Sequence, residues 1–250
     1  MNSEHPGRPG GVEPGRGPRN ALIAAMSDVD RSRLLALSSD VVLEDGTTVC
    51  RQGERMDCAY FPVSGAIALL SAVAQRSPVA LGLVGREGVV GPMLAFGPRI
   101  AIVDGVAQGP ARAWRVDADD LVAHMAGCPH LGRRVADFQH ALLIGLLRAG
   151  VCTCVHELRP RLARWLLMSI DRPQAGSHKH RIDQTHQRLA DWLGVRRSAV
   201  TLAAGSLQSE GLIRYRRGGI GIVSRAGLKA VACGCYRAIA SGEGASADWQ

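Results

Sequence analysis

A short run near the C-terminal end of the chain carries residue types that recognise nucleic acids. Arg196, Arg197 and Ser198 are consecutive, and Thr201 follows three positions later. An arginine can donate two parallel hydrogen bonds to the major-groove edge of guanine, and a hydroxyl can donate or accept at a base or a phosphate. At the start of a helix these side chains would share an outer face. The pattern therefore predicts a helix that contacts DNA with its N-terminal end.

The distribution of charge supports this prediction. The 250 residues carry a formal net charge of +8. Residues 177–240 contain eleven Lys or Arg and three acidic residues, so this segment alone accounts for the whole excess. Such a concentration is typical of a domain that meets a polyanion, although arginines on a surface are often only solvated. The prediction of a DNA interface therefore depends on the fold that carries the charge.

Two short helices are predicted around the cationic run. The first covers residues 185–193, with Thr185 as its N-cap, and the second covers residues 196–210. Gly194 lies between them, where a tight turn needs a backbone conformation that side chains disfavour. These features predict a helix-turn-helix.

A β-hairpin is predicted directly after the second helix, over residues 212–223 with a turn at residues 218–219. It would act as a wing, and its arginines could reach phosphates. These arginines are Arg214, Arg216 and Arg217. A helix-turn-helix pattern alone is a weak signal, but its coincidence with a wing and with the charge excess is specific.

The preceding part of the chain has a different pattern. Residues 41–116 are short β-branched or apolar runs separated by glycines, which predicts compact antiparallel β-structure. A short helical region is expected at residues 21–37, with Ser27 as an N-cap inside it, and helical spacing returns at residue 117. We predict an α+β fold: an N-terminal antiparallel, jelly-roll-like β-roll, a long dimerisation helix and a C-terminal winged helix-turn-helix.

The long helix is expected over residues 129–159. One apolar seam follows steps of three and four, a period of 3.5 that is typical of helix pairing. The seam consists of Leu131, Val135, Phe138, Leu142, Gly145, Ala149, Cys152 and His156. Packing of this helix on its own β-domain is the alternative, but Leu143, Leu146 and Leu147 supply a second apolar face. We therefore expect a homodimer formed through residues 129–159.

The domain boundaries follow from these patterns. A Gly/Pro-rich tail at residues 1–20 is expected to be disordered, and residues 241–250 are expected to be flexible. The β-roll would cover residues 21–128 and the winged-helix domain residues 160–240. No apolar run reaches the roughly 20 residues of a membrane helix, and no signal peptide is visible. We therefore expect a cytoplasmic protein without a membrane partner.

Two segments resemble the winged helix of the Crp/Fnr superfamily of bacterial transcription regulators. They are residues 185–201 (THQRLADWLGVRRSAVT) and residues 207–220 (LQSEGLIRYRRGGI). The order of β-roll, dimer helix and winged helix in that superfamily agrees with the order predicted here. Residues 161–168 (RLARWLLM) and 232–236 (ACGCY) are similar to one branch whose members mostly have no assigned effector.

The resemblance implies a homodimer that binds double-stranded DNA at an inverted-repeat operator, with RNA polymerase as a further partner. It implies that Arg197, Ser198 and Thr201 read base edges and that Arg196 contacts either a base or a phosphate. Phosphate contacts at the start of the first helix are implied for Thr185, His186 and Gln187.

Members of the superfamily that bind cyclic nucleotides use a Gly-Glu pair for the ribose and an Arg-Ser/Thr-Ala step for the phosphate. Glu87 and Arg99 are the residues here that resemble these ligands. Ile100 stands at the hydroxyl position and cannot donate a hydrogen bond. We expect a degenerate effector pocket without a cofactor, and binding of a cyclic nucleotide is the alternative.

The seven cysteines do not form a recognisable disulfide framework, because their number is odd and no secretion signal is present. Two C-x-C pairs occur, Cys152/Cys154 and Cys233/Cys235. On a helix, the side chains of residues two apart point about 200° apart, so neither pair alone can bind one ion. Cys152 and His156 are four residues apart and could bind the same ion. We expect structural roles for these residues and no metal.

No enzymatic function is expected, and no catalytic residue is assigned. The chain has no G-x-S-x-G elbow, no P-loop and no cupin-type set of histidines on strands. Two other functions compete with a DNA-binding regulator that has a degenerate effector domain. One is a thiol- or metal-responsive regulator of the same fold, and the other is a cyclic-nucleotide-binding module whose basic end meets a partner other than DNA.

Overall fold

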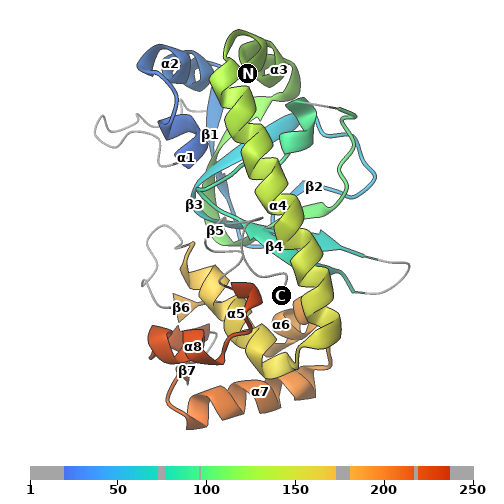
Figure 1. The fold of residues 1–250 in the computed structure, drawn as a ribbon, viewed down its shortest axis with the longest axis vertical. Helices are drawn as coiled ribbons and strands as arrows, with labels where there is room; N and C mark the ends of the chain where they lie inside the picture. The colour runs from blue at the N-terminus through green and yellow to red at the C-terminus, as the bar shows by residue number, and fades with distance from the viewer. Residues whose placement is uncertain (1–19, 73–76, 96, 173–180, 217–218, 237–250) are drawn as a thin grey trace, which may run out of the picture.

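The computed structural model describes residues 20–72, 77–95, 97–172, 181–216 and 219–236. A β-sheet domain and a smaller, mainly helical domain are joined by a long helix that runs along one side of the sheet domain (Figure 1). The mixed α+β architecture predicted from the sequence is confirmed. The tail at residues 1–19 and the C-terminal residues 241–250 lie outside the described residues.

An antiparallel sheet forms the N-terminal domain. Its strands are β1 (Ser38–Leu43), β2 (Thr48–Cys50), β3 (Cys58–Ser71), β4 (Val79–Val84) and β5 (Asp104–Asp117). The order is β1-β5-β3-β4, and β2 pairs with β5. Phe61 of β3 lies opposite Trp114 of β5. The run at residues 100–105, predicted as part of a strand, instead contributes an isolated bridge from Ile100 to Arg55 and the start of β5.

The same domain contains four short helices: α1 (Ala21–Ala24), α2 (Asp28–Ala36), the 3-10 helix η1 (Pro92–Ala95) and α3 (Ala118–Gly127). Ser27 caps α2 as predicted, because its hydroxyl accepts a hydrogen bond from the backbone amide of Asp30. Asn20 was expected in the disordered tail but is fully buried. Its side chain caps α1 and also donates to the carbonyls of Pro62 and Gly88, so Asn20 belongs to the folded domain and not to the tail.

The predicted long helix, α4, covers Pro129–Val155 and so ends four residues earlier than expected, and the next helix, α5, covers Leu158–Ile170. The sequence suggested a break at Pro160, but the chain leaves the helix at His156, and Glu157 is the N-cap of α5. Pro160 lies in the first turn of α5, where a backbone N–H has no helical partner and a proline is therefore tolerated.

The apolar seam of α4 packs inside its own chain. Leu131, Val135, Ala149 and Cys152 are buried, and Phe138 and Leu142 pack against the core of the β-sheet domain. The prediction that this seam pairs with another helix is therefore wrong. The period of 3.5 identifies a packed face but cannot identify the partner.

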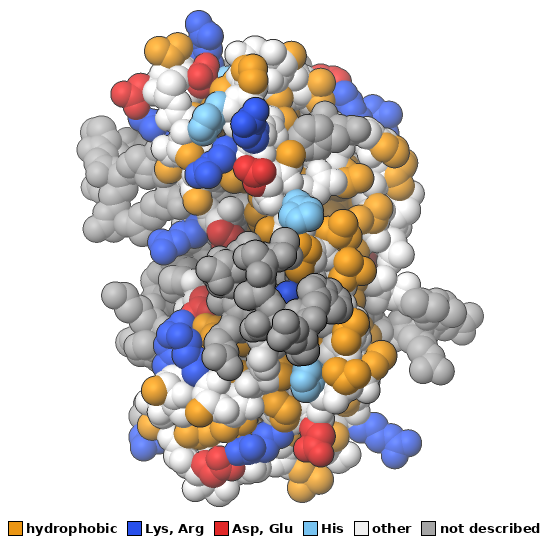
Figure 2. Space-filling model, viewed as in Figure 1, with side chains coloured by type: hydrophobic (Ala, Val, Ile, Leu, Met, Phe, Trp, Pro, Cys, Tyr) orange, Lys and Arg blue, Asp and Glu red, His pale blue; other side chains and the backbone are white. Residues whose placement is uncertain are grey.

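The outer face of α4 is apolar as well. Leu143, Leu147, Val151 and Val155 are 54–65% exposed, and side chains of this type form a stripe along the helix (Figure 2). By length and composition, α4 is the one helix in the described part of the chain that could cross a membrane. One face of this helix packs against the core of the β-sheet domain.

The C-terminal domain continues from α5. Its elements are β6 (Arg181–Ile182), α6 (His186–Leu193), α7 (Arg197–Ser209), β7 (Ile213–Arg216), β8 (Gly219–Ile222) and α8 (Arg225–Val231). The three strands form an antiparallel sheet in the order β6-β8-β7. The predicted helix-turn-helix and hairpin are confirmed, except that Gly219, expected in the turn, is the first residue of β8 and pairs with Arg216.

Strands β3 and β4 separate two hydrophobic cores. Leu69 of β3 and Val84 of β4 face the core of the N-terminal domain. Their neighbours Leu70 and Leu83 face a second core, which includes Trp165 of α5 and the helices of the C-terminal domain. The alternation follows from the strand geometry, in which successive side chains point to opposite sides. The C-terminal domain is thus packed directly on the sheet.

Candidate DNA-binding surface

The first helix of the motif, α6, is held by a cap and an apolar face. The Thr185 hydroxyl accepts a hydrogen bond from the Arg188 amide at 3.2 Å, which confirms the predicted N-cap. Trp192 packs edge to face on Trp165 of α5, with ring centroids 5.6 Å apart. Gly194 ends the helix with φ 67° and ψ 38°, the left-handed conformation that the turn was predicted to need.

The second helix, α7, has one buried face and one exposed face. Val200, Ala204 and Leu207 are buried in the second core. Side chains on the opposite face are exposed: Arg196, Arg197, Ser198, Thr201 and Leu202. The predicted orientation of the cationic run is therefore observed.

Arg196 and Arg197 stand at the positive end of the dipole of α7. Arg196 is the N-cap residue, makes no side-chain capping bond, and is followed by Arg197 in the first turn. Cations at this end of a helix are electrostatically unfavourable. In the described part of the chain, neither arginine has a salt bridge to an acidic residue. The arrangement leaves two exposed cations available to an anionic partner.

Leu202 is a residue that sequence reasoning missed. It is 76% exposed, the most exposed large hydrophobic side chain described. It stands four residues after Ser198, so both lie on the outer face of α7. An exposed apolar side chain at such a position can contact the methyl group of thymine. Its helical spacing from Ser198 was the signal available in the sequence.

His186 does not have the exposed position implied for a phosphate contact. Its ring is half-buried, packs edge to face on Tyr215 of β7 at 4.4 Å, and places Nδ1 3.0 Å from Oγ1 of Thr201. The Thr201 hydroxyl donates to the Arg197 carbonyl, so the His186 Nδ1–H must donate to Thr201. His186 therefore connects α6, α7 and the wing. Burial, and next the charge of Arg197, lowers the pKa of His186.

The remaining predicted contacts differ in their availability. Thr185 and Gln187 are exposed, and Gln187 donates a hydrogen bond to Asp191 at 2.9 Å. Arg214 is exposed on β7, without a salt bridge among the described residues. The side chain of Arg216 and all of Arg217 lie outside the described residues. The wing is joined to α7 by a hydrogen bond from the Tyr215 amide to the Gln208 side chain.

Arg188 of α6 belongs to a contact between the two domains. Its guanidinium forms a salt bridge with Asp45 at 2.7 Å and lies 5.2 Å from the centre of the Trp192 ring. Arg172 and Glu87 form a second salt bridge between the domains, also at 2.7 Å. These pairs connect the winged helix to the β-roll, so the guanidinium of Arg188 is engaged within the protein and is not free to contact DNA.

The structure does not bring Glu87 and Arg99 together as a nucleotide site. Glu87 is paired with Arg172, and Arg99 is paired with Asp119 at 2.6 Å. A cavity of about 520 Å³ lies between the β-roll and α4, and neither residue lines it. Its walls are mainly apolar, including Met56, Leu69, Val84, Ile100 and Leu142.

The structure combines a β-roll, a long helix and a winged helix, and the second helix of the helix-turn-helix has an unpaired cationic end on the surface. This combination defines a class of DNA-binding transcription regulators. Two family models match the sequence within these parts. The model of the cyclic nucleotide-binding domain matches residues 40–127, and that of the Crp-like helix-turn-helix domain matches residues 160–231. The chain belongs to the Crp/Fnr superfamily of transcription regulators.

Solved structures of this superfamily share the fold. The c-di-GMP-responsive global regulator CLP of Xanthomonas campestris is 19% identical, covers 79% of this chain and 100% of its own, and superposes with a TM-score of 0.64. A transcriptional regulator of the Crp/Fnr family from Eubacterium rectale is 16% identical, with coverages of 84% and 97% and a TM-score of 0.63. No curated protein matches the sequence.

Proposed function

We propose that this regulator binds an inverted-repeat operator as a homodimer, with one α7 helix in each of two successive major grooves. The observation that carries the proposal is the exposed face of α7, where Arg196, Arg197 and Ser198 have no acidic partner among the described residues. A helix of this kind contacts base edges with its N-terminal residues, and the two half-sites of a dimer lie about 34 Å apart.

The exposed stripe on α4 supports the homodimer. Leu143, Leu147, Val151 and Val155 follow one another at intervals of four residues. A helix surface with this spacing buries its apolar area when it packs against a copy of itself. This face, rather than the seam expected from the sequence, is the surface that we assign to the second chain.

The cavity supports a degenerate effector domain. A cyclic nucleotide needs cationic and hydroxyl groups around its phosphate, whereas Arg99 is paired with Asp119 and Ile100 contributes an apolar side chain to the wall. Calorimetric titration with cyclic AMP should give no heat of binding. Saturable binding that is lost in Arg99→Ala would contradict this part of the proposal.

The DNA-binding proposal is tested by selecting operators from a palindromic library and measuring affinity at two salt concentrations. Affinity should fall steeply with salt, because Lys and Arg contacts release counterions from the DNA. Arg33 is exposed on α2, so Arg33→Ala removes one positive charge far from α7 and is the matched control for Arg197→Ala. Weak binding without sequence preference would favour a basic surface for a partner other than DNA.

A cytoplasmic location and a contact with RNA polymerase belong to the same proposal, because a regulator of transcription acts where the DNA and the polymerase are. A pull-down of RNA polymerase by the operator-bound dimer tests the second partner. Recovery that is independent of operator DNA would contradict a contact formed at the promoter.

A further inference from the structure

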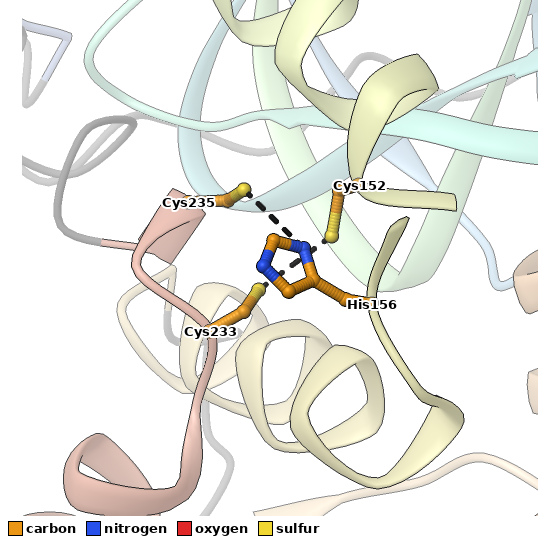
Figure 3. Close-up of side chains that lie close together, drawn as sticks. All are labelled: Cys152, His156, Cys233 and Cys235. Carbon is orange, nitrogen blue, oxygen red and sulfur yellow. Dashed lines mark hydrogen bonds between the residues drawn. The ribbon is translucent and has the colours of Figure 1, made fainter. Parts of the chain in front are cut away.

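Three thiols and one imidazole converge where α4 meets the end of the DNA-binding domain (Figure 3). Cys152 lies in the last turn of α4, and His156 is the C-cap residue. Cys233 and Cys235 come from the segment after α8. Sequence spacing could be used to judge only pairs within one segment, whereas the fold combines two residues from each of two distant segments. Cys154, two positions from Cys152, is exposed and is not part of the cluster.

The distances in the cluster match those between the ligands of a tetrahedral ion. All four ligand atoms lie within 4.8 Å of one another. The Sγ atoms of Cys152 and Cys233 are 3.5 Å apart, and Sγ of Cys235 is 3.9 Å from Nδ1 of His156. With Zn–S bonds of about 2.3 Å and Zn–N bonds of about 2.0–2.1 Å, the edges of a tetrahedral site are about 3.8 Å (S to S) and about 3.6 Å (S to N).

The charge around the cluster also fits a metal. Arg164 of α5 is only 4% exposed, and its Nε and Nη1 atoms have no hydrogen-bond partner among the described residues. It interacts electrostatically with Cys152, Cys233 and Cys235. A buried cation is costly without a compensating charge. A divalent ion with three thiolates and a neutral imidazole carries a net charge of −1, which would offset part of the positive charge of Arg164 and of Arg161, a second buried arginine that interacts with Cys152 and Cys233.

We propose that Cys152, His156, Cys233 and Cys235 bind one Zn²⁺ ion in a tetrahedral site. Three thiolates and one histidine form a ligand set typical of structural zinc, in which all four positions are filled by the protein. The ion connects the end of α4 to the segment after α8, and thereby fixes the DNA-binding domain to the long helix. This proposal replaces the expectation that the chain binds no metal, and it does not depend on the proposed binding of an operator.

The test measures zinc in the full-length protein after anaerobic purification without a chelator. We expect one zinc per chain by elemental mass spectrometry. Cys154→Ser is the matched control, because it removes a nearby thiol outside the cluster and should retain the metal. Cys233→Ser should lose at least nine-tenths of the zinc. Cys233 is buried, so Cys235→Ser at a half-buried position is the second variant, and circular dichroism of each variant reports its folding.

Two further measurements identify the geometry and the role of the ion. Replacement of zinc by Co²⁺ should give the intense visible absorption of a tetrahedral ion and a thiolate charge-transfer band, both lost in Cys235→Ser. Zinc should raise the melting temperature of the metal-free wild type and of Cys154→Ser but not that of Cys235→Ser, because a ligand that binds only the folded state stabilises it.

Several results would overturn the proposal. The first two are that the wild type contains no zinc and takes up none, and that folded Cys233→Ser and Cys235→Ser both retain zinc. The other two are a stoichiometric content of iron or copper in place of zinc, and a Cys152–Cys233 disulfide in the anaerobic protein. None of these measurements includes DNA. A zinc-loaded protein that fails to bind any operator would therefore contradict the proposed function and leave the metal site intact.

Discussion

His186 of α6 donates a hydrogen bond from Nδ1 to Oγ1 of Thr201 on α7, across a distance of 3.0 Å. The same ring packs on Tyr215 of the wing. One side chain thus sets the relative positions of the three elements that would approach DNA. Because Thr201 Oγ1 also donates to the Arg197 carbonyl, the contact reaches the backbone of a proposed base-reading residue.

Replacement of His186 should loosen this junction. In His186→Ala we expect a loss of about 1–2 kcal/mol in the free energy of unfolding, from one hydrogen bond and one aromatic contact. Chemical denaturation measures the loss. Gln187→Ala, next in the chain but exposed, is the control and should remain within about 0.5 kcal/mol of the wild type. Equal effects of the two substitutions would show that the ring contacts are not formed.

The stability should also depend on pH through His186. Its pKa is lowered from the ordinary 6.5 by burial and then by Arg197. Below pH 6.5 the unfolded chain therefore binds a proton that the folded chain excludes, so stability is full above pH 6.5 and falls as the pH decreases through this region. The free energy of unfolding, measured by chemical denaturation at several pH values between 5 and 8, should therefore change less with pH in His186→Gln than in the wild type. His124, whose pKa is also lowered by burial, should supply part of the slope that remains.

Substitution of Arg197 and substitution of Arg214 should affect DNA binding in different ways. Arg197→Ala should relax specificity at one base pair in each half-site, at a cost of about 1–3 kcal/mol. Arg214→Ala should weaken binding to all operators equally and reduce the salt slope by about 1, as expected for a phosphate contact. Competition assays with single-base operator variants separate these outcomes. If Arg197→Ala lost the same affinity for every operator variant, this arginine would contact the DNA backbone and not a base.

Leu202 should read a methyl group. Replacing thymine by uracil removes only the C5 methyl, so a uracil-containing operator should bind the wild type more weakly, whereas Leu202→Ala should not discriminate between the two operators. Because the side chain is 76% exposed, the variant should keep the wild-type melting temperature. Identical discrimination by both proteins would remove Leu202 from the base contacts.

Leu147 should be required for assembly. Leu147→Glu places a charge in the exposed stripe of α4, and repulsion and desolvation at a self-complementary interface should give a monomer in sedimentation velocity experiments. Leu202→Glu is the control, because it makes the same change at a comparably exposed leucine on α7. A dimeric Leu147→Glu protein would place the interface elsewhere.

Local signals in the sequence predicted much of the C-terminal domain. Thr185 and Gly194 mark the ends of α6, since a cap and a left-handed turn depend on neighbouring residues only. The burial of Val200 and Leu207 and the exposure of Arg197 follow from the helical period. The same reasoning located Ser27 as a cap and the β-rich part of the N-terminal domain.

Relationships between distant segments could not be predicted in this way. The seam of α4 has the correct period, but whether it contacts the same chain or a second one depends on the position of the β-roll. The expectation of no metal came from the spacing of neighbouring residues, and local spacing cannot show that Cys152 lies beside Cys233, 81 positions away. The use of Arg188 for a salt bridge with Asp45 likewise depends on how the two domains pack.

Strands β3 and β4 form a single layer of sheet between the two hydrophobic cores. Leu69 and Val84 line the cavity, while the adjacent Leu70 and Leu83 support the winged helix on the reverse side. The wall of the cavity and the support of α6 and α7 are therefore opposite faces of the same two strands. A substitution on one face of these strands lies only one backbone away from the packing on the other face.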